Sequence, residues 1–146
     1  MSAPELKIEN QLCYLVHRLD QALLARYRPL LEGLSLTYTQ YMAMLVLWDR
    51  GEQSIGALCT AMGLDTGTVS PLVKRLERSG YVLRRRDRKD ERSVKIELTQ
   101  EGRALRDRAE SVPGTIASCL LAREDEYLEL RGLLERLLAR LEENRD

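Results

Sequence analysis

The sequence predicts a mainly α-helical fold with one small β-hairpin. Over most of the chain, apolar residues recur at spacings of three and four, as on one face of a helix. Residues 81–86 and 93–98 instead alternate apolar and polar residues, as strands do. Residues 87–92 between them are rich in charge and turn formers. The two strands therefore form a hairpin with a long basic tip, which must pack on the helices to be stable.

The bulk composition is that of a folded globular protein. The chain has 146 residues, of which 44% are hydrophobic and 32% charged. This length suits one domain, or a small domain with long helical extensions. No apolar run approaches the roughly 20 residues that span a bilayer, and residues 1–10 hold no signal-peptide core. We therefore expect a cytoplasmic protein.

Two helices are expected in the first third of the chain. Residues 6–31 carry one apolar stripe. The stripe consists of Leu12, Leu15, Val16, Leu19 and Leu23. Thr37 and Gln40 then form a capping box before residues 41–48. Because residues 41–48 are apolar on every side, this second helix should be buried.

A helix-turn-helix follows. Ser54 can cap a short helix that ends at Gly63, and Asp65 can cap a second helix that ends at Gly80. Two short helices joined by a tight turn with glycine form this motif. Its second helix is the candidate reader helix.

Pro71 leaves two starting points for the reader helix. If the helix starts after Asp65, Pro71 lies past the first turn and removes one backbone hydrogen bond. If it starts after Ser70, Pro71 takes the first helical position, which proline favours. The sequence is compatible with both.

Positive charge gathers in the reader helix and the hairpin. Between Thr66 and Lys95 the chain has ten basic and four acidic residues, so this segment carries +6 and the rest −6. The basic residues are Lys74, Arg75, Arg78, Arg84, Arg85, Arg86, Arg88, Lys89, Arg92 and Lys95. A basic segment in an otherwise acidic protein predicts a polyanionic partner, and nucleic acid is the first candidate.

The reader helix could enter the major groove of double-stranded DNA. There its N-terminal residues would face base edges. These are small or bear hydroxyls: Thr66, Thr68, Ser70 and Pro71. Lys74 and Arg75, about one turn further on, would reach phosphates, which position a protein without specifying sequence.

The hairpin tip could contact DNA through Arg86, Arg88, Lys89 and Arg92. An arginine at such a tip can enter a narrow A·T-rich minor groove, where the potential is most negative. Asp90 or Glu91 could pair with Arg92 and hold it in position. A basic loop that is only solvated is the alternative, and the preceding helix-turn-helix counts against it.

The C-terminal third predicts two more helical segments. Thr99 caps the first, which is interrupted around residues 112–114. The last helix carries a stripe made of Leu130, Leu133, Leu134, Leu137, Leu138 and Leu141. This stripe and the one on residues 6–31 both need partners. They pack within the chain or, as we favour, build a two-fold homodimer, which DNA reading also requires.

We therefore predict two regions. Residues 1–34 with 113–146 form a helical dimerisation region, and residues 35–112 form a winged helix-turn-helix domain that binds DNA. The fold class is thus a winged helix-turn-helix with N- and C-terminal dimerisation helices.

The three cysteines, Cys13, Cys59 and Cys119, show no metal-binding spacing. Without a CxxC or CxxH pattern no zinc site, and no other metal or cofactor, is expected. An odd number of thiols in a reducing compartment argues against structural disulfides. By their neighbours alone, Cys13 and Cys59 read as small buried hydrophobes on apolar helices.

Several motifs resemble one known family. Residues 65–77 read Asp-x-Gly-Thr-Val-Ser-Pro-Leu-Val-Lys-Arg-Leu-Glu, residues 90–93 read Asp-Glu-Arg-Ser, and residues 98–102 read Leu-Thr-x-x-Gly. At these spacings they resemble the MarR family of winged-helix transcription regulators. Within that family, four further segments look like the organic hydroperoxide resistance regulators: residues 6–13, 27–31, 36–41 and 113–116. Those regulators are dimeric repressors that release DNA when an organic peroxide oxidises a cysteine.

The resemblance implies roles for individual residues. Cys13 matches the peroxide-sensing thiol, and Tyr27 and Tyr38 match tyrosines whose hydroxyls face it across the dimer interface. Arg92 matches the minor-groove arginine of the hairpin, with Asp90 as its orienting partner. Some members have a second cysteine before the last helix that forms an intersubunit disulfide with the sensor, and Cys119 lies in that region.

His17 departs from the family pattern, because several relatives carry a third tyrosine near the sensor. One helical turn after Cys13, it could add a donor or a positive charge to a thiolate. It could equally be an interfacial packing residue. Tyr27 and Tyr38 could likewise be core aromatics.

The sequence thus predicts a dimeric DNA-binding repressor that releases its operator when Cys13 is oxidised. One alternative is a MarR-type repressor released by a small aromatic ligand in the interhelical cleft. A second, from another class, is a thiol peroxidase; we do not expect an enzyme, because the basic hairpin serves no such role. A winged-helix module that binds another protein is a third.

Overall fold

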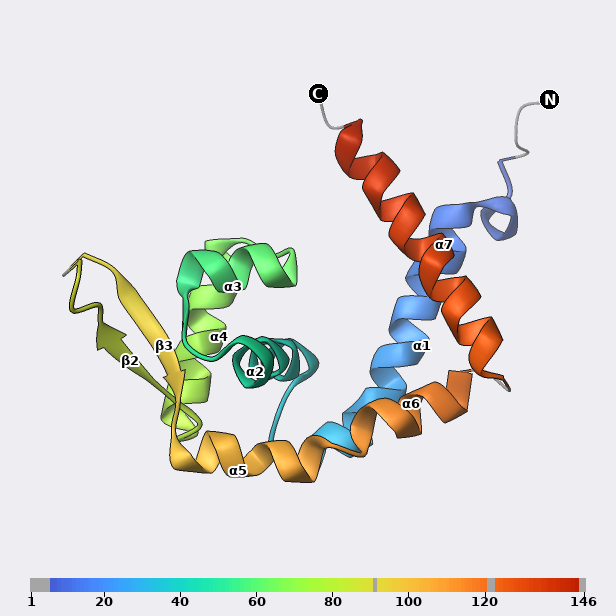
Figure 1. Ribbon diagram of the computed structural model, residues 1–146. Coiled ribbons are helices and arrows are strands. Elements are labelled where there is room, and N and C mark those ends of the chain that lie inside the picture. The colour runs from blue at the N-terminus through green and yellow to red at the C-terminus, as the bar shows by residue number, and fades with distance from the viewer. Residues whose placement is uncertain (1–5, 91, 121–122, 145–146) are drawn as a thin grey trace. The chain divides into compact units, whose positions relative to one another are not determined.

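The computed structural model of the chain describes residues 6–90, 92–120 and 123–144 (Figure 1). It divides into two compact units, Met1–Glu110 and Ser111–Asp146. Together the described residues are mainly helical with one small antiparallel sheet. The predicted fold class, a winged helix-turn-helix with a β-hairpin, is confirmed.

The first unit carries the helix-turn-helix and the sheet. A short 3₁₀ helix, Ile8–Asn10, precedes the longer helices. These are α1 (Leu12–Glu32), α2 (Tyr38–Arg50), α3 (Ile55–Met62), α4 (Thr66–Arg78) and α5 (Gln100–Ala109). The strands are β1 (Gln53–Ser54), β2 (Val82–Arg86) and β3 (Val94–Leu98).

The predicted caps all start helices. Thr37 accepts a hydrogen bond from the Gln40 backbone N–H over 3.3 Å, and Gln40 accepts one from Thr37 over 2.9 Å, completing the capping box of α2. Ser54 accepts from the N–H of Ala57 and starts α3. The side chains of Asp65 and Thr99 likewise accept the N–H three residues on and start α4 and α5. These bonds satisfy N–H groups that the first helical turn leaves unpaired.

Helix α1 differs from its predicted bounds. It starts at Leu12 rather than near Leu6 and runs through Pro29 to Glu32. After it, Ser35 adopts a left-handed φ of 55°. Its N–H bonds the carbonyl of Glu32, and the N–H of Leu36 bonds that of Leu31, each over 3.0 Å. This is a Schellman end with serine at a position that usually holds glycine.

Pro71 lies inside α4, so the reader helix starts after Asp65 and the later start is excluded. The proline sits on the exposed side of the helix. The opposite face is buried and consists of Val69, Leu72, Val73 and Leu76. This packing holds α4 together although Pro71 supplies no N–H.

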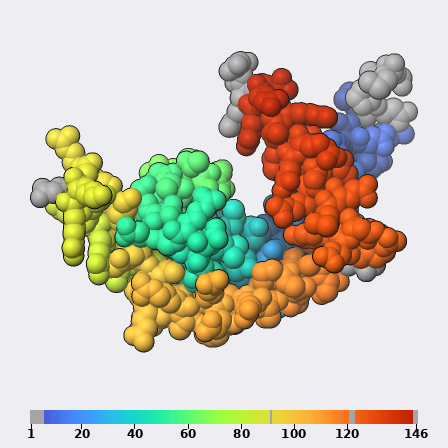
Figure 2. All heavy atoms as spheres, in the orientation of Figure 1, coloured from blue at the N-terminus to red at the C-terminus, as the bar shows by residue number. Residues whose placement is uncertain are grey.

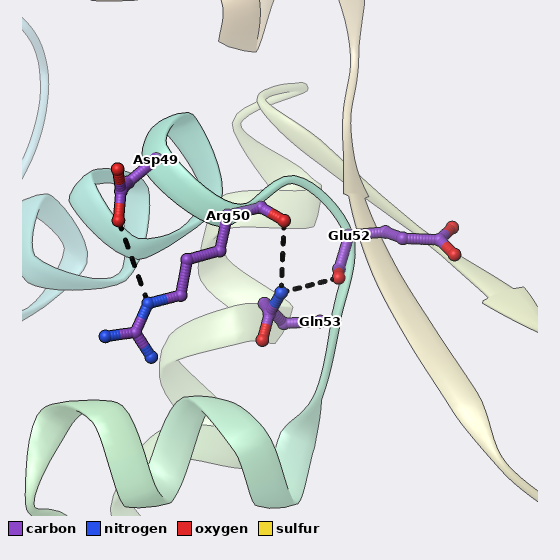
Figure 3. A network of polar contacts seen from close by, with 4 residues as sticks. All are labelled: Asp49, Arg50, Glu52 and Gln53. Atoms are coloured by element: carbon purple, nitrogen blue, oxygen red, sulfur yellow. Dashed lines mark hydrogen bonds and ion pairs between the residues drawn. The ribbon is translucent and has the colours of Figure 1, made fainter.

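The sheet has the order β1-β3-β2, with both pairs antiparallel. Strands β2 and β3 form the predicted hairpin, with Arg84 opposite Ile96. Strand β1 was not predicted, because two residues are too few to show an alternating pattern. It pairs with β3, and Nε2 of its first residue, Gln53, donates to the carbonyls of Arg50 and Glu52 in the preceding turn at 3.3 and 2.7 Å (Figure 3).

The core of the first unit is built from α2, α3, α4 and the sheet. Its most deeply buried side chains include Met44, Leu47, Leu58, Val69, Val73, Leu76, Val82 and Ile96. The prediction that α2 is buried on every side is wrong, since Leu45 is 42% exposed and Met42, Val46 and Trp48 are half-buried. Helix α2 therefore buries one side and leaves the other partly exposed.

The second unit consists, in the described residues, of α6 (Val112–Leu120) and α7 (Glu124–Glu143). The predicted interruption before α6 is present, but it falls at Glu110 and Ser111. Pro113 instead lies in the first turn of α6, where its missing N–H costs nothing. No helix in the parts of the chain that the structure describes has the length and apolarity to cross a membrane.

Gly102 allows α5 to pack against the start of the hairpin. A Cβ at this position would lie 2.1 Å from the carbonyl oxygen of Tyr81 and 3.0 Å from its carbonyl carbon. The Gly102 carbonyl also accepts a hydrogen bond of 2.8 Å from Trp48 Nε1, which joins α5 to α2. The predicted Leu-Thr-x-x-Gly motif is therefore a packing motif between backbones.

Replacing Gly102 with alanine should destabilise the fold. In an open helix this change stabilises by about 0.5–1 kcal/mol, but here the overlap with backbone should reverse the sign and cost about 2 kcal/mol or more. Urea unfolding of Gly102→Ala beside Gly114→Ala measures this, because a Cβ at Gly114 in α6 meets nothing within 4 Å. Equal midpoints for the two variants would contradict the packing role of Gly102.

Candidate nucleic-acid interface and thiol site

The exposed face of α4 carries most of the predicted base-reading residues. Thr66, Thr68 and Pro71 are exposed, and Ser70 is half-buried. Lys74 and Arg75 follow on the exposed side. Since Val69 and its buried neighbours fill the other face, α4 presents a continuous edge of short side chains followed by cations. This matches the geometry of a helix that lies in a major groove.

The α3–α4 turn fixes the start of the reader helix. Gly63 adopts a left-handed φ of 64° at the end of α3. Asp65 Oδ1 then accepts a hydrogen bond of 2.8 Å from the N–H of Thr68. Cys59 Sγ lies 3.8 Å from the Thr66 hydroxyl. The prediction of a buried core cysteine is therefore wrong in degree: Cys59 is only half-buried and contacts the first residue of α4.

The hairpin tip is ordered by its own aspartates. Asp87 Oδ1 accepts the N–H of Lys89, and Asp90 Oδ1 accepts the N–H of Arg92, each over 3.0 Å. The carbonyl of Asp90 accepts the N–H of Ser93 over 2.9 Å. Asp90 thus fixes the backbone of Arg92, whereas the prediction had it orient the side chain. Glu91, the other predicted partner, lies outside the described residues.

Part of the positive charge is paired within the sheet region. Arg84 Nε lies 3.4 Å from Glu77 Oε2, and Arg85 Nε lies 2.8 Å from Glu97 Oε1. These two arginines are therefore poorly placed to contact phosphates. Seven other cations of the segment are exposed: Lys74, Arg75, Arg78, Arg86, Arg88, Lys89 and Arg92. In Figure 2 the hairpin tip, drawn in yellow, stands clear of the helices of its own unit.

The two predicted redox cysteines are both accessible. Cys13 lies in the first turn of α1 and Cys119 near the end of α6, and both thiols are free and exposed. His17, one turn after Cys13, is exposed as well. Among the described residues no group of His, Cys, Asp or Glu side chains could hold a metal ion.

Tyr27 and Tyr38 lie together in one chain. Their ring centroids are 4.8 Å apart, and Tyr41 extends the cluster with its centroid 6.0 Å from that of Tyr27. Burial, and secondarily the carboxylate of Asp20, raises the pKa of the Tyr38 hydroxyl. The phenol therefore keeps its proton at neutral pH and can donate it in a hydrogen bond.

Cys13 cannot meet these tyrosines within its own chain. Cys13 and Tyr27 both lie on the continuous helix α1. At 1.5 Å rise per residue they are separated by about 21 Å along its axis. A contact between the thiol and the tyrosine cluster would therefore have to form between two copies of the chain.

A cavity of about 390 Å³ adjoins the tyrosine cluster. It is lined by Leu24, Arg28, Leu31, Glu32, Leu36, Thr37 and Tyr38, from α1, the α1–α2 connection and the start of α2. Its lining combines leucines with a guanidinium, a carboxylate, a hydroxyl and a phenol. Sequence reasoning did not single out Arg28, because nothing in the local pattern separates it from a solvated arginine.

The fold and the exposed basic elements define a winged-helix regulator that binds DNA. Comparison with known proteins agrees: residues 25–109 match the family model of the SarA/Rot transcriptional regulators. The chain is 38% identical to an organic hydroperoxide resistance transcriptional regulator of Bacillus subtilis, over 93% of this chain and 92% of that protein. It therefore belongs to the MarR family of winged-helix transcription regulators, and within it to the organic hydroperoxide resistance regulator type.

Solved structures show the same architecture. The structure of reduced AbfR bound to DNA has a TM-score of 0.84 and 31% identity, with 100% of both chains covered. AbfR, from Staphylococcus epidermidis, also has a disulfide-formed structure, with a TM-score of 0.64 and 32% identity over 93% of this chain and 90% of that one. BpsR of Bordetella bronchiseptica, whose DNA binding is regulated by 6-hydroxynicotinic acid, has a TM-score of 0.80 and 25% identity, covering 87% and 92%.

Removing the Arg92 side chain should weaken DNA binding with little effect on folding. We expect the slope of log affinity against log salt to fall by about one, since one cation no longer displaces a counterion from a phosphate or groove. Arg106→Ala is the matched control, because Arg106 is an exposed arginine of α5 outside the basic segment. Titrations at four salt concentrations measure both slopes, and an unchanged slope in Arg92→Ala would contradict the role of the tip.

Proposed function

We propose that this regulator is a homodimeric repressor that senses organic hydroperoxides through Cys13 and then releases its operator. The observation that carries the proposal is the exposed Cys13 thiol beside open leucines of α1, about 21 Å from tyrosines that only another chain can bring to it. The likeness to the Bacillus regulator supports the same reading. Relatives named as regulators also favour it over a thiol peroxidase.

Dimerisation follows from the apolar faces of the terminal helices. On α1 the exposed side chains are Leu12, Leu15, Val16 and Leu19, with Leu12 62% exposed. On α7 they include Leu128, Leu133, Leu134, Leu138 and Leu141, with Leu141 61% exposed. An exposed apolar face of this kind, on each of the two helices, marks an interaction site. We propose that a second copy covers it, so that residues 1–34 with 113–146 form the dimerisation region and residues 35–112 the DNA-binding domain.

The proposed chemistry begins with a Cys13 thiolate. Its sulfur attacks the terminal oxygen of the hydroperoxide, the O–O bond breaks, and the peroxide leaves as an alcohol after taking up a proton. Sulfur is oxidised to a sulfenic acid. The partner's Tyr27 and Tyr38 hydroxyls would donate hydrogen bonds to the thiolate, and His17 could add a donor or a positive charge.

A disulfide with Cys119 would complete the switch. The Cys119 thiol of the second copy attacks the sulfenic sulfur, the S–S bond forms, and water leaves. Such a bond requires the two Cα atoms to come within about 7 Å. The disulfide-formed AbfR structure shows that a relative of this fold can form a disulfide.

In the reduced dimer, two copies of α4 would read a pseudo-palindromic operator. Two-fold symmetry places the half-site centres about one helical turn, roughly 10 bp, apart. The exposed residues on α4 and at the hairpin tip would supply the contacts: Thr66, Thr68, Ser70, Pro71, Lys74, Arg75, Arg86 and Arg92, with Asp90 fixing the tip. Arg92 would take the minor groove.

Operator binding before and after oxidation tests the proposal. Fluorescence anisotropy should show tight binding by the reduced wild type and release after one equivalent of an organic hydroperoxide. Cys13→Ser should bind and ignore peroxide, Cys59→Ser should respond like the wild type, and Cys119→Ser should bind and respond less completely. If the wild type stays bound to its operator after peroxide treatment, the sensing proposal is wrong. If Cys119→Ser releases the operator completely, no second thiol is needed.

Tyr38→Phe should slow the oxidation of Cys13 without unfolding the protein. A lost hydrogen bond to a charged sulfur weakens thiolate stabilisation, and we expect about a tenfold slower reaction with peroxide. Tyr41→Phe is the control, because Tyr41 is a deeply buried member of the same aromatic cluster. Stopped-flow oxidation measures both rates; equal rates would show that Tyr38 does not face the thiol.

A ligand-released repressor is the second candidate. The 390 Å³ cavity has the size for a small aromatic acid, and Arg28 and Tyr38 could bind its carboxylate, although the carboxylate of Glu32 in the same lining opposes an anion. BpsR, a neighbour in fold, is regulated by an aromatic acid of this kind. Release of DNA by such an acid from Cys13→Ser, with no response of the wild type to peroxide, would favour this candidate.

A further inference from the structure

Two neighbouring carbonyls at the end of α1 are held by side chains of the DNA-binding elements. The Tyr81 hydroxyl donates a hydrogen bond of 3.1 Å to the carbonyl oxygen of Leu34. The Arg108 guanidinium donates to the carbonyl oxygen of Gly33. Tyr81 lies between α4 and β2, and Arg108 in the last turn of α5. The α1–α2 connection is thus tied at two adjacent points, through Tyr81 to the base of the hairpin and through Arg108 to the last turn of α5.

Tyr81 is itself fixed on the hairpin side. Its N–H donates to the carbonyl of Leu76 at the end of α4 over 3.1 Å, and its carbonyl accepts the N–H of Thr99 over 3.0 Å. The same carbonyl packs on Gly102, where even one added carbon would overlap it. Tyr81 therefore cannot shift unless α4, β3 and α5 adjust with it.

The α1–α2 connection is equally constrained. Leu34 is only 5% exposed, and the next residue, Ser35, is held in a left-handed conformation by the Schellman bonds. This connection leads directly into Tyr38, whose ring packs at a tilt against that of Tyr27. Because α1 carries Cys13 at its other end, a displacement of α1 must either carry Gly33 and Leu34 along or break their two hydrogen bonds.

We propose that Tyr81 is a positioning residue that couples α1 to the reading elements, with Arg108 as its second contact. The inference rests on the proposed function, because the coupling is expressed as the loss of DNA affinity when Cys13 is oxidised. A movement of α1 on oxidation pulls the hairpin base through Tyr81 and the end of α5 through Arg108, and so takes the hairpin and α4 out of register with DNA. Neither Tyr81 nor Arg108 is among the residues proposed to contact peroxide or DNA.

Tyr81→Phe tests the coupling, since it keeps the ring and removes only the donor. The readout is the ratio of the operator Kd of the oxidised protein to that of the reduced protein. We expect the reduced Kd to change less than about threefold while the ratio falls by about 2- to 10-fold, the range of one net hydrogen bond. Arg108→Gln should lower the ratio in the same direction. Arg106→Gln, which changes another exposed arginine of α5, should leave the ratio at the wild-type value.

Three results would overturn the coupling. The first is a wild-type ratio in both Tyr81→Phe and Arg108→Gln. The second is an equal weakening of the reduced and the oxidised operator affinities together with a lower melting temperature. This result would show that the Tyr81 hydrogen bond only stabilises the fold. The third is a wild type that keeps its operator after peroxide. In that case the proposed function fails, and the coupling fails with it. This result is distinguishable from the other two because the wild type alone shows it.

Discussion

The burial of one face of α4 is the constraint on which the rest of the structure depends. Val69, Leu72, Val73 and Leu76 form the inner side of this helix and fill the core between α2, α3 and the sheet. At roughly 1.5–3 kcal/mol for each fully buried large apolar side chain, this face outweighs the hydrogen bond lost at Pro71. It also fixes the rotation of the helix. Because the apolar side chains must face the core, the polar side chains between them lie on the surface, where they can face DNA.

Several side chains also donate hydrogen bonds to backbone carbonyls of other elements. Trp48 donates to Gly102, Thr99 to Gly80 and Tyr81 to Leu34. These bonds join elements that are distant in the sequence, and each is expected to add about 0.5–1.5 kcal/mol of net stability. The hairpin is thereby a rigid attachment of the helices, so that its basic tip projects from a firm base.

The sequence predicted the local features well and the long-range ones poorly. Caps such as Thr37 and Asp65 act on N–H groups three residues away, so their signal is contained in a short pattern. Strand β1, the Tyr81 bond to Leu34 and the pairing of Arg84 with Glu77 depend on tertiary packing that no local pattern encodes. The thiol site was suggested by family resemblance alone, because the residues around Cys13 look like an ordinary apolar helix.

The short side chains at the leading edge of α4 have a consequence for the range of operators. Along this helix, Arg75 is the first residue with a forked side chain that could form two hydrogen bonds to one base edge. Such a bidentate contact discriminates between bases by about 1–3 kcal/mol. Hydroxyls and the Pro71 ring discriminate less sharply. Single base changes in a half-site should then be tolerated, while an inserted base pair between half-sites should not. The set of genes under control would be defined more by the geometry of their promoters than by a strict consensus.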